Sequence, residues 1–174
     1  VAKGCFKVGL YKQGLLHDMS KYSPTEFWVG AKYYQGTRSP NNAEREDIGY
    51  SSAWLHHKGR NKHHYEYWID YSMQALPGGM APVPMPDKYI AEMIMDRIAA
   101  SKVYMGGEYM DRSPLDYYYQ GTDRAPIHPE TKAKLLYVLE MLAEEGEEKT
   151  FRFIKKELVQ QKRCMDWHQL KKAE

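Results

Sequence analysis

The sequence predicts an all-α protein with about six to eight helices. Apolar residues recur at helical spacing in most segments, whereas the period-two alternation typical of strands is nearly absent. Serine followed by proline, a signature of helix starts, opens two of these segments. The length of 174 residues is sufficient for one domain with its own core. We therefore expect a single domain over residues 1–174, with a frayed tail at 165–174.

Three helices are predicted in the N-terminal part. The first covers residues 1–13, and a short second helix covers 15–21. The third follows the run Ser23-Pro24-Thr25-Glu26, which supplies an N-cap, a proline at the first helical position and the glutamate of a capping box. This helix continues to Gly36, and residues 37–42 then form a polar loop.

The middle of the chain is predicted to be helical until a proline-rich connection. A helix is expected over residues 44–58, and Gly59-Arg60-Asn61 interrupts it. Helix resumes over residues 64–73. The segment from Pro77 to Pro86 is too rich in proline and glycine to continue a helix, so we expect an extended connection.

The C-terminal half contains the strongest helix predictions. The longest helix covers residues 87–105 and ends at a glycine pair. Its apolar face consists of Ile90, Met93, Ile94 and Ile98. A short helix starts at Ser113 and includes residues 117–119. An amphipathic helix capped by His128 stops near Gly146, and a last helix spans residues 148–164.

Composition and charge exclude several classes of protein. A formal net charge of +2 is too small for a dedicated nucleic-acid binder. Cys5 and Cys164 stand at opposite ends, so we expect no disulfide framework and a reducing compartment. No apolar run is long enough to cross a membrane, and no signal peptide opens the chain. A cytoplasmic protein is the expectation.

Five of the seven histidines fall in two short stretches, around His17 and between His56 and His64. Imidazole is the commonest neutral metal ligand in proteins. His17 is followed by Asp18, and a buried aspartate beside a histidine needs a compensating cation. Taken alone, the pair could equally be an aspartate that caps a turn next to a packed histidine.

The second stretch favours the metal interpretation. His57 and His64 are seven residues apart, so they share a face if the helix persists. We take them as ligands, with His63 as the alternative to His64, and expect Asn61 to orient an imidazole or a water. His56 and His63 lie one residue off this face, so we expect both to be solvated bystanders.

Glu92 and Asp96 supply carboxylates on the longest helix. They are four residues apart and project together. Because apolar residues precede Asp96, we predict that this turn is buried and that Asp96 is the distal metal ligand. Glu92 then supports a ligand or acts as a base. The alternative is a surface salt bridge from Asp96 to Arg97 or Lys88.

The chain resembles an uncharacterised family of small bacterial and phage proteins, DUF5662, over most of residues 1–140. The runs that carry the likeness are His17–Phe27, Asn61–Trp68 and Met85–Asp96. The His-Asp-x-x-Lys run at residues 17–21 is also similar to that of the HD superfamily of metal-dependent phosphohydrolases. In that superfamily a further histidine lies on the helix before the dyad. Residues 1–16 contain none, so we expect that ligand upstream of Val1, or an incomplete site.

The superfamily resemblance implies an HD-domain-like helical bundle around one or two divalent ions, which could be Mn, Fe, Zn, Co or Ni. It implies a hydrolase that acts on a nucleotide or another small phosphoester through a metal-activated water. Lys21 and Arg60 would neutralise phosphate oxygens, and Glu92 or His64 would carry the proton.

The sequence is also compatible with two other functions. One is an HD-like di-iron oxygenase. The other is a non-catalytic protein that binds a nucleotide or a partner and holds a structural metal. The oligomeric state is open as well, and a homodimer is one option.

Overall fold

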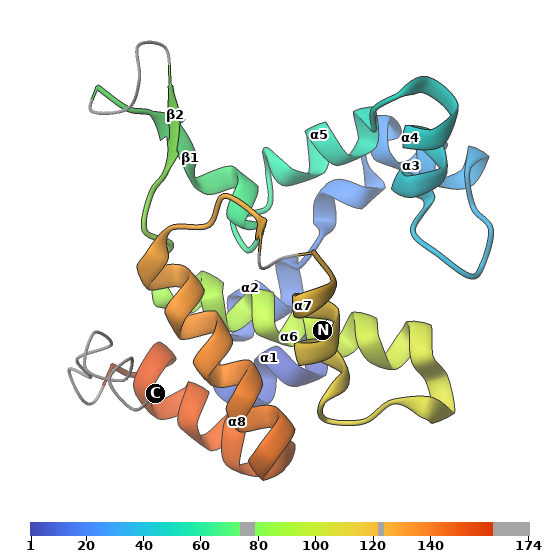
Figure 1. The fold of residues 1–174 in the computed structure, drawn as a ribbon. Helices are drawn as coiled ribbons and strands as arrows, with labels where there is room; N and C mark the ends of the chain where they lie inside the picture. Colours follow the sequence, from blue (N-terminus) through green and yellow to red (C-terminus); the bar gives the residue numbers. More distant parts are fainter. Residues whose placement is uncertain (74–78, 122–123, 162–174) are drawn as a thin grey trace.

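A computed structural model of the chain describes residues 1–73, 79–121 and 124–161 (Figure 1). These residues form eight α-helices and one small two-stranded sheet, so the predicted all-α fold with six to eight helices is confirmed. Among the described helices, none combines the length and apolar character that a membrane crossing requires. The predicted tail at 165–174, together with Cys164 and His168, lies outside the described residues.

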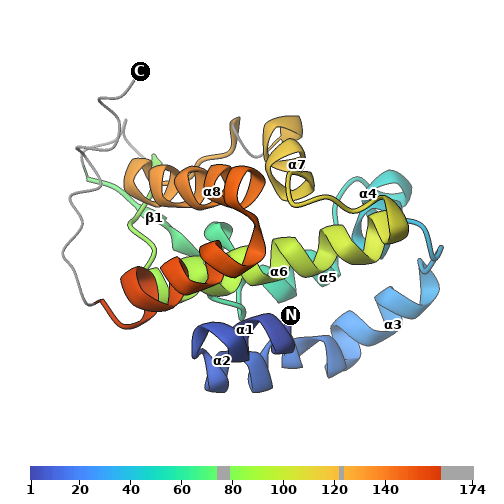
Figure 2. The ribbon, with the colours of Figure 1, turned by 90° about the horizontal axis from the view of Figure 1, so that it is seen from below.

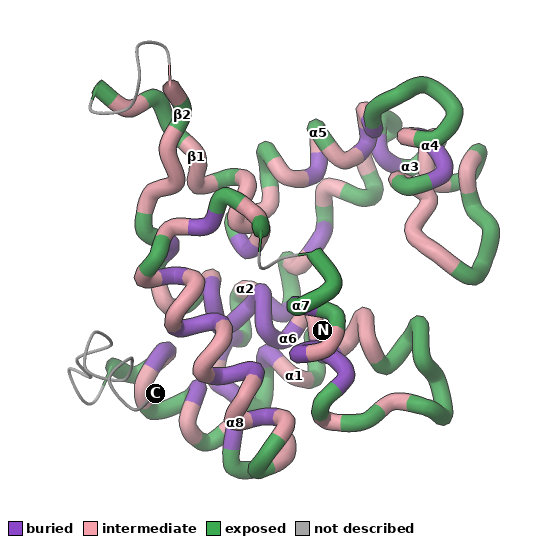
Figure 3. Tube along the Cα trace, in the orientation of Figure 1, coloured by how far each residue is buried: buried purple, intermediate pink, exposed green. Residues whose placement is uncertain are grey.

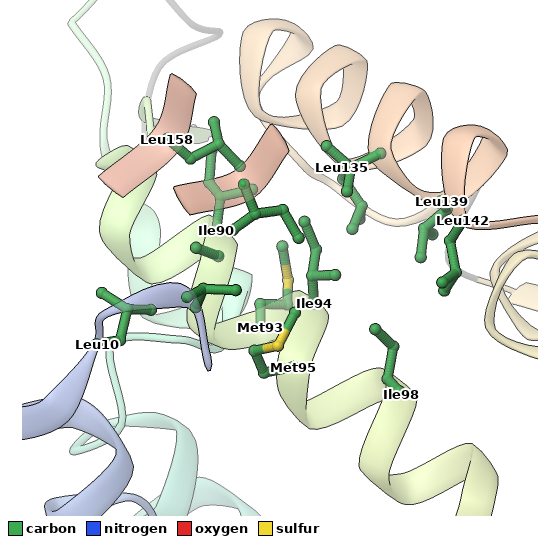
Figure 4. Packing of buried hydrophobic residues seen from close by; sticks show 14 of the residues in the cluster. Leu10, Ile90, Met93, Ile94, Met95, Ile98, Leu135, Leu139, Leu142 and Leu158 are labelled. Atoms are coloured by element: carbon green, nitrogen blue, oxygen red, sulfur yellow. The ribbon is translucent and has the colours of Figure 1, made fainter. Parts of the chain in front are cut away.

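Helix α6 (Asp87–Met105) runs through the middle of the molecule and has the bounds predicted from the sequence (Figure 2). Its four predicted apolar residues are all buried. One face of α6 meets α8 (Pro129–Phe153) in the main hydrophobic cluster (Figure 4). The facing side chains are Ile90, Ile94 and Ile98 on α6 and Leu135, Leu139 and Leu142 on α8. This packing leaves another face of α6 for polar residues.

Three further segments cover α6. Helix α1 (Ala2–Val8), helix α7 (Ser113–Gly121) and a π-helical segment (Ile154–Val159) all contact it. Burial is accordingly concentrated where α6 is surrounded (Figure 3). As predicted, His128 caps α8, because its ring accepts the backbone N–H of Glu130 at 3.3 Å.

Helix α8 is broken at Gly146, which has a φ of 78° and a ψ of 172°. The predicted stop near this glycine is therefore confirmed. The two parts of α8 run in opposite directions, so the chain after Gly146 returns along the core (Figures 1 and 2). Glycine adopts this backbone conformation readily, whereas other residues are strained in it. The last helix was predicted at 148–164, but its described part turns π-helical at Ile154.

The N-terminal helix differs from the prediction. Residues 1–13 form two helices, α1 and α2 (Tyr11–Leu16), because Gly9 adopts a φ of 89° and ends α1. The short helix predicted at 15–21 is also wrong. His17 and Asp18 instead form the tight connection between α2 and a 3-10 turn at Met19–Tyr22.

Helix α3 (Pro24–Lys32) starts where the sequence predicts. The Ser23 hydroxyl accepts the backbone N–H of Glu26 at 3.4 Å, and Pro24 occupies the first turn. The capping box is nevertheless not closed, because the Glu26 carboxylate turns to two histidines instead. The helix ends at Lys32 rather than at Gly36.

The helix predicted at 44–58 is two helices. Helix α4 (Pro40–Ile48) begins inside the predicted loop, with Pro40 in its first turn, and Gly49 ends it with a φ of 84°. The Ser-Pro signal that marks two other helix starts was therefore also present here. Helix α5 (Ser52–Lys58) follows, and the Ser51 hydroxyl accepts the Trp54 N–H at 3.0 Å.

The predicted helix at 64–73 is wrong. The chain forms a 3-10 turn at Tyr65–Trp68 and then strand β1 (Ile69–Tyr71), which pairs antiparallel with β2 (Met80–Pro82). Ile69 and Tyr71 are residue types that favour strands. The partner strand β2 lies outside residues 64–73, so the periodicity of that segment alone does not reveal the pairing. The connection from Pro82 to Pro86 is extended as predicted, whereas Pro77 and Gly78 lie outside the described residues.

Helices α3, α4 and α5 pack together on one side of α6, apart from the hydrophobic core (Figure 1). The segments that lead into and out of this group are the α2–α3 connection and the turn after α5. Both carry the histidines singled out in the sequence. The fold thus places these two segments near the polar face of α6.

Candidate metal centre

Seven side chains from three segments meet beside α6. His17 and Asp18 come from the α2–α3 connection, and Glu92 and Asp96 come from α6. The remaining three are histidines from the end of α5 and the turn after it, namely His57, His63 and His64. Nitrogen and oxygen atoms of these residues form three overlapping groups, in each of which all ligand atoms lie within 4.8 Å of one another.

His17 has a carboxylate at each ring nitrogen. Nδ1 lies 3.1 Å from Oε1 of Glu92, while Nε2 lies 3.3 Å from Oδ2 of Asp18 and 3.4 Å from Oδ1 of Asp96. Burial lowers the pKa of His17, but the interactions with Asp18, Asp96 and Glu92 outweigh it and raise the pKa to about 11. A proton therefore occupies this ring when no other cation is near.

Asp18 lies at the centre of the group. Its backbone is left-handed, with a φ of 57°, a conformation in which aspartate and asparagine are enriched. Its Oδ1 lies 3.3 Å from Nε2 of His57 and 3.4 Å from Nε2 of His63, and Lys21 approaches Oδ2 at 2.6 Å. Burial opposes the charge on Asp18, but His17, His57 and Lys21 hold the pKa of its carboxyl well below the usual range.

Two of the three later histidines, His57 and His63, are contacted at Nδ1 by a carboxylate. Nδ1 of His57 lies 2.7 Å from Oε2 of Glu26, and Nδ1 of His63 lies 3.3 Å from Oε1 of Glu92. A carboxylate only accepts hydrogen bonds, so each Nδ1 carries the hydrogen. In the neutral ring this leaves Nε2 as a bare lone pair, turned toward Asp18.

His64 completes the group from the side. Its Nε2 lies 2.9 Å from Nε2 of His57, and its ring packs edge-on against Trp54. Burial and the neighbouring His63 and His57 lower the pKa of His64 to about 2, so the ring is neutral. A neutral imidazole is the form that binds a metal ion.

Three buried atoms at the centre have no hydrogen-bond partner. They are Nε2 of His17, Nε2 of His63 and Oδ1 of Asp18. Polar atoms of neighbouring site residues lie 3.3–3.4 Å from them without forming a hydrogen bond. Two ligands bound to one ion at about 2.0–2.2 Å lie about 3–3.6 Å apart. The residues present therefore fit a divalent cation.

The structure brings together all the residues predicted as metal ligands, namely His17, Asp18, His57, His64 and Asp96. Their role as ligands stays a prediction. The expectation that His63 is solvated was wrong, because it is 2% exposed and lies inside the cluster together with His64, to which it was the alternative ligand. The chain leaves the helix after Lys58, so the sequence spacing from His57 does not determine whether the ring of His63 or that of His64 faces inward.

The other predicted residues divide into two groups. Glu92 lies behind His17 and His63, and Lys21 contacts Asp18. Arg60 is exposed, and its guanidinium donates to the backbone carbonyl of His56 at 3.4 Å rather than to the cluster. The proposed phosphate contact of Arg60 is not part of this arrangement.

Asn61 stabilises the turn that carries the histidines. Its amide donates to the carbonyl oxygen of His57 at 2.9 Å and to the Ser20 hydroxyl at 2.7 Å. It therefore ties the α5 end to the α2–α3 connection. The amide nitrogen also lies 3.1 Å from Nδ1 of His57, so Asn61 contacts the imidazole as well as the backbone of that residue.

Glu26 is a site residue that the sequence interpretation missed. It was assigned to a capping box, yet its carboxylate is buried and reaches both His56 and His57 at 2.7 Å. Burial raises its pKa, but His56, Ser20 and His57 outweigh this and lower it. No local pattern distinguishes a glutamate that caps its own helix from one that turns to another helix.

A hollow of about 490 Å³ opens beside the cluster, between α3, α5 and the C-terminal half of α6. Asp18, Lys21, His57, His64 and Asp96 all line it. These five residues are therefore reachable by a small molecule from this side.

Comparison with known proteins gives one match. A family model described as a family of unknown function, DUF5662, matches residues 1–141. No curated protein and no solved structure matches the chain.

Proposed function

The chain belongs to the DUF5662 family, and from the chemistry of its site we propose that it is a metal-dependent phosphohydrolase. The observation that carries the proposal is the orientation of the buried imidazoles. Carboxylates behind His17, His57 and His63 contact each Nδ1, so that each Nε2 points toward Asp18, and Nε2 of His17, Nε2 of His63 and Oδ1 of Asp18 have no hydrogen-bond partner. Metal-binding histidines are typically supported in this way.

We assign two cation positions that share Asp18. One is formed with His17 and Asp96, and the other with the three later histidines. Four imidazoles and two carboxylates favour Mn, Fe, Co, Ni or Zn over Mg or Ca, which prefer all-oxygen sites. With His63 included, the proposed site contains four histidines. The proposal therefore requires no ligand from before Val1.

A divalent cation held by these residues would lower the pKa of a bound water and polarise a phosphoryl oxygen. The protein contributes position and charge. Asp18 and Asp96 line the hollow and face an incoming ligand. Lys21 also lines the hollow, with its side chain 63% exposed, and supplies a positive charge for a phosphate oxygen.

Glu92 has a supporting role in this proposal. It is 5% exposed, does not line the hollow, and binds two imidazoles through one oxygen. It therefore orients His17 and His63 rather than exchanging protons with a substrate. The all-helical frame and the His17-Asp18 pair support a relationship to the HD superfamily, which remains part of the proposal.

A di-iron oxygenase would use a similar ligand set, and Lys21 distinguishes the two. A lysine paired with the shared carboxylate at the open side suits an anionic substrate, and oxygen activation has no need of it. Iron-dependent colour together with oxygen consumption would favour the oxygenase. Bound metal without turnover of any phosphoester would favour a binding protein.

The direct test is metal content and hydrolysis in wild type and Asp18→Asn. Asparagine tolerates the left-handed backbone of residue 18 but removes the shared charge. We expect one to two equivalents of metal in wild type, and hydrolysis of p-nitrophenyl phosphate or its diester. Both should be lost in Asp18→Asn. Asp116→Asn, at a surface ion pair with Arg112, is the matched control.

Two results would overturn the proposal. One is a wild-type protein that takes up none of the five metals on dialysis. The other is hydrolysis that persists in metal-free Asp18→Asn.

A further inference from the structure

The hollow beside the metal centre has two chemically different ends. Its inner end is formed by the metal-binding side chains and Lys21. The rest of the lining includes the start of α4, with the polar residues Ser39 and Asn41, and a set of aromatic or small residues, namely Phe27, Gly30, Ala31, Tyr34, Trp54 and Tyr104. A site with charged groups at one end and aromatic rings at the other suits a ligand that carries a charged group at one end and a planar apolar group at the other.

One face of α3 provides much of the aromatic end. Phe27, Gly30 and Ala31 follow the i, i+3, i+4 spacing that places residues on one side of a helix, and Tyr34 follows just after the C-terminal end of α3. Residue Phe27 is 52% exposed and residue Tyr34 is 74% exposed, although both line the hollow. They offer open apolar faces on which a planar group can stack.

Gly30 keeps this end open. It lies inside α3 with an ordinary helical backbone, and a Cβ added there would meet no atom within 4 Å. Glycine is among the poorest helix formers, and neither a close contact nor a positive φ requires it here. The consequence of the missing side chain is space in the hollow.

The charges at the inner end limit the anion. Among the residues that line the hollow in the described part of the chain, Lys21 is the one lysine or arginine, whereas Asp18, Glu26 and Asp96 are acidic. Positive charge for a substrate therefore comes from the bound metal and a single side chain. This suits one phosphate group better than a polyphosphate chain, which binds to several cationic groups.

We infer that the hollow binds a phosphate monoester with a planar aromatic group, of the size of a nucleoside monophosphate, and that Gly30 sets the size of the group admitted. The phosphate lies at the metal and Lys21, and the ring lies against Phe27 and Tyr34. This inference rests on the proposed function, because the metal holds the phosphate end.

The test uses binding rather than turnover. The probes are phosphonate analogues of adenosine 5′-monophosphate and of ribose 5-phosphate, in which carbon replaces the scissile oxygen. Calorimetric titration of the metal-loaded full chain should show roughly tenfold or tighter binding of the adenosine compound, since stacking of a base on aromatic side chains contributes at least that much.

Gly30→Leu should remove this preference, because leucine fills the aromatic end. Metal content and affinity for the ribose compound should be unchanged. Gly121→Leu is the matched control, since Gly121 is also a helical glycine with open space around it but does not line the hollow. Phe27→Ala is a second variant that removes an exposed wall, and it should also reduce the preference.

The outcomes separate the two proposals. If metal binds and the ribose compound binds, but wild type shows no preference for the adenosine compound, the inference about the hollow is wrong. The same holds if Gly30→Leu and Phe27→Ala both keep the preference. If neither metal nor either phosphonate binds, the proposed function itself fails.

Discussion

The Glu92 carboxylate lies 3.1 Å from Nδ1 of His17, across 75 residues of sequence. The same oxygen lies 3.3 Å from Nδ1 of His63. One buried carboxylate thus sets the hydrogen position of two imidazoles and turns both Nε2 atoms toward Asp18. Burial raises the pKa of Glu92, but His17 and His63 outweigh it and lower the pKa, so the group stays charged.

Glu92→Gln should weaken metal binding by roughly 10–100-fold, the usual effect of losing a group that supports metal ligands. Glutamine keeps the size but can present an N–H to one of the histidines, which disturbs their tautomers. Competition with a chromogenic chelator measures the affinity. Glu148→Gln, at an exposed position on α8, is the control. Equal affinities in wild type and Glu92→Gln would contradict the role assigned to Glu92.

His63→Ala and His56→Ala should differ. His63 lies inside the cluster, so its loss removes a ligand and lowers metal affinity by at least roughly tenfold. His56 contacts Glu26 at 2.7 Å and belongs to none of the three ligand groups, so its loss should change the affinity only slightly. Equilibrium dialysis with metal analysis compares the two. A larger loss in His56→Ala would show that the ring assignment is wrong.

Metal uptake should release protons. In the metal-free protein the pKa of His17 is about 11, so the ring is protonated at neutral pH. A metal ion that binds Nε2 must displace that proton, and metal affinity therefore rises with pH and falls in acid. Calorimetric titration in two buffers of different ionisation enthalpy should give a release of about one proton or more per chain. An absence of proton release near pH 7 would contradict the position assigned to His17.

Gly146→Ala should destabilise the protein by about 1–3 kcal/mol, because the backbone of residue 146 lies in a region essentially restricted to glycine. An added Cβ would also approach Oδ2 of Asp111 to 3.1 Å. Urea unfolding measures the change. Gly107→Ala has an ordinary φ and open surroundings, so it should be close to neutral. Metal affinity should stay the same in both variants.

Much of the fold could be predicted because its signals are local. Helix α6 has the predicted bounds, since its apolar periodicity and terminal glycines lie within one window. The start of α3 follows from Ser23 and Pro24 in the same way. The prediction failed where partners are distant. Strand β1 forms because Met80–Pro82 pairs with it, and nothing within residues 64–73 reveals that partner.

For the candidate site, the sequence by itself determined the kinds of ligand and two of the segments that carry them. His17-Asp18 and the Glu92–Asp96 turn are informative because adjacent residues, or residues one helical turn apart, stay together in any fold. Only the tertiary structure decided that His63 faces inward, that Arg60 faces outward and that Glu26 supports His57. The physical reason is that the chain after Lys58 leaves the helix, so ring orientation there depends on contacts with Asp18, Ser20 and Glu92 from distant parts of the chain.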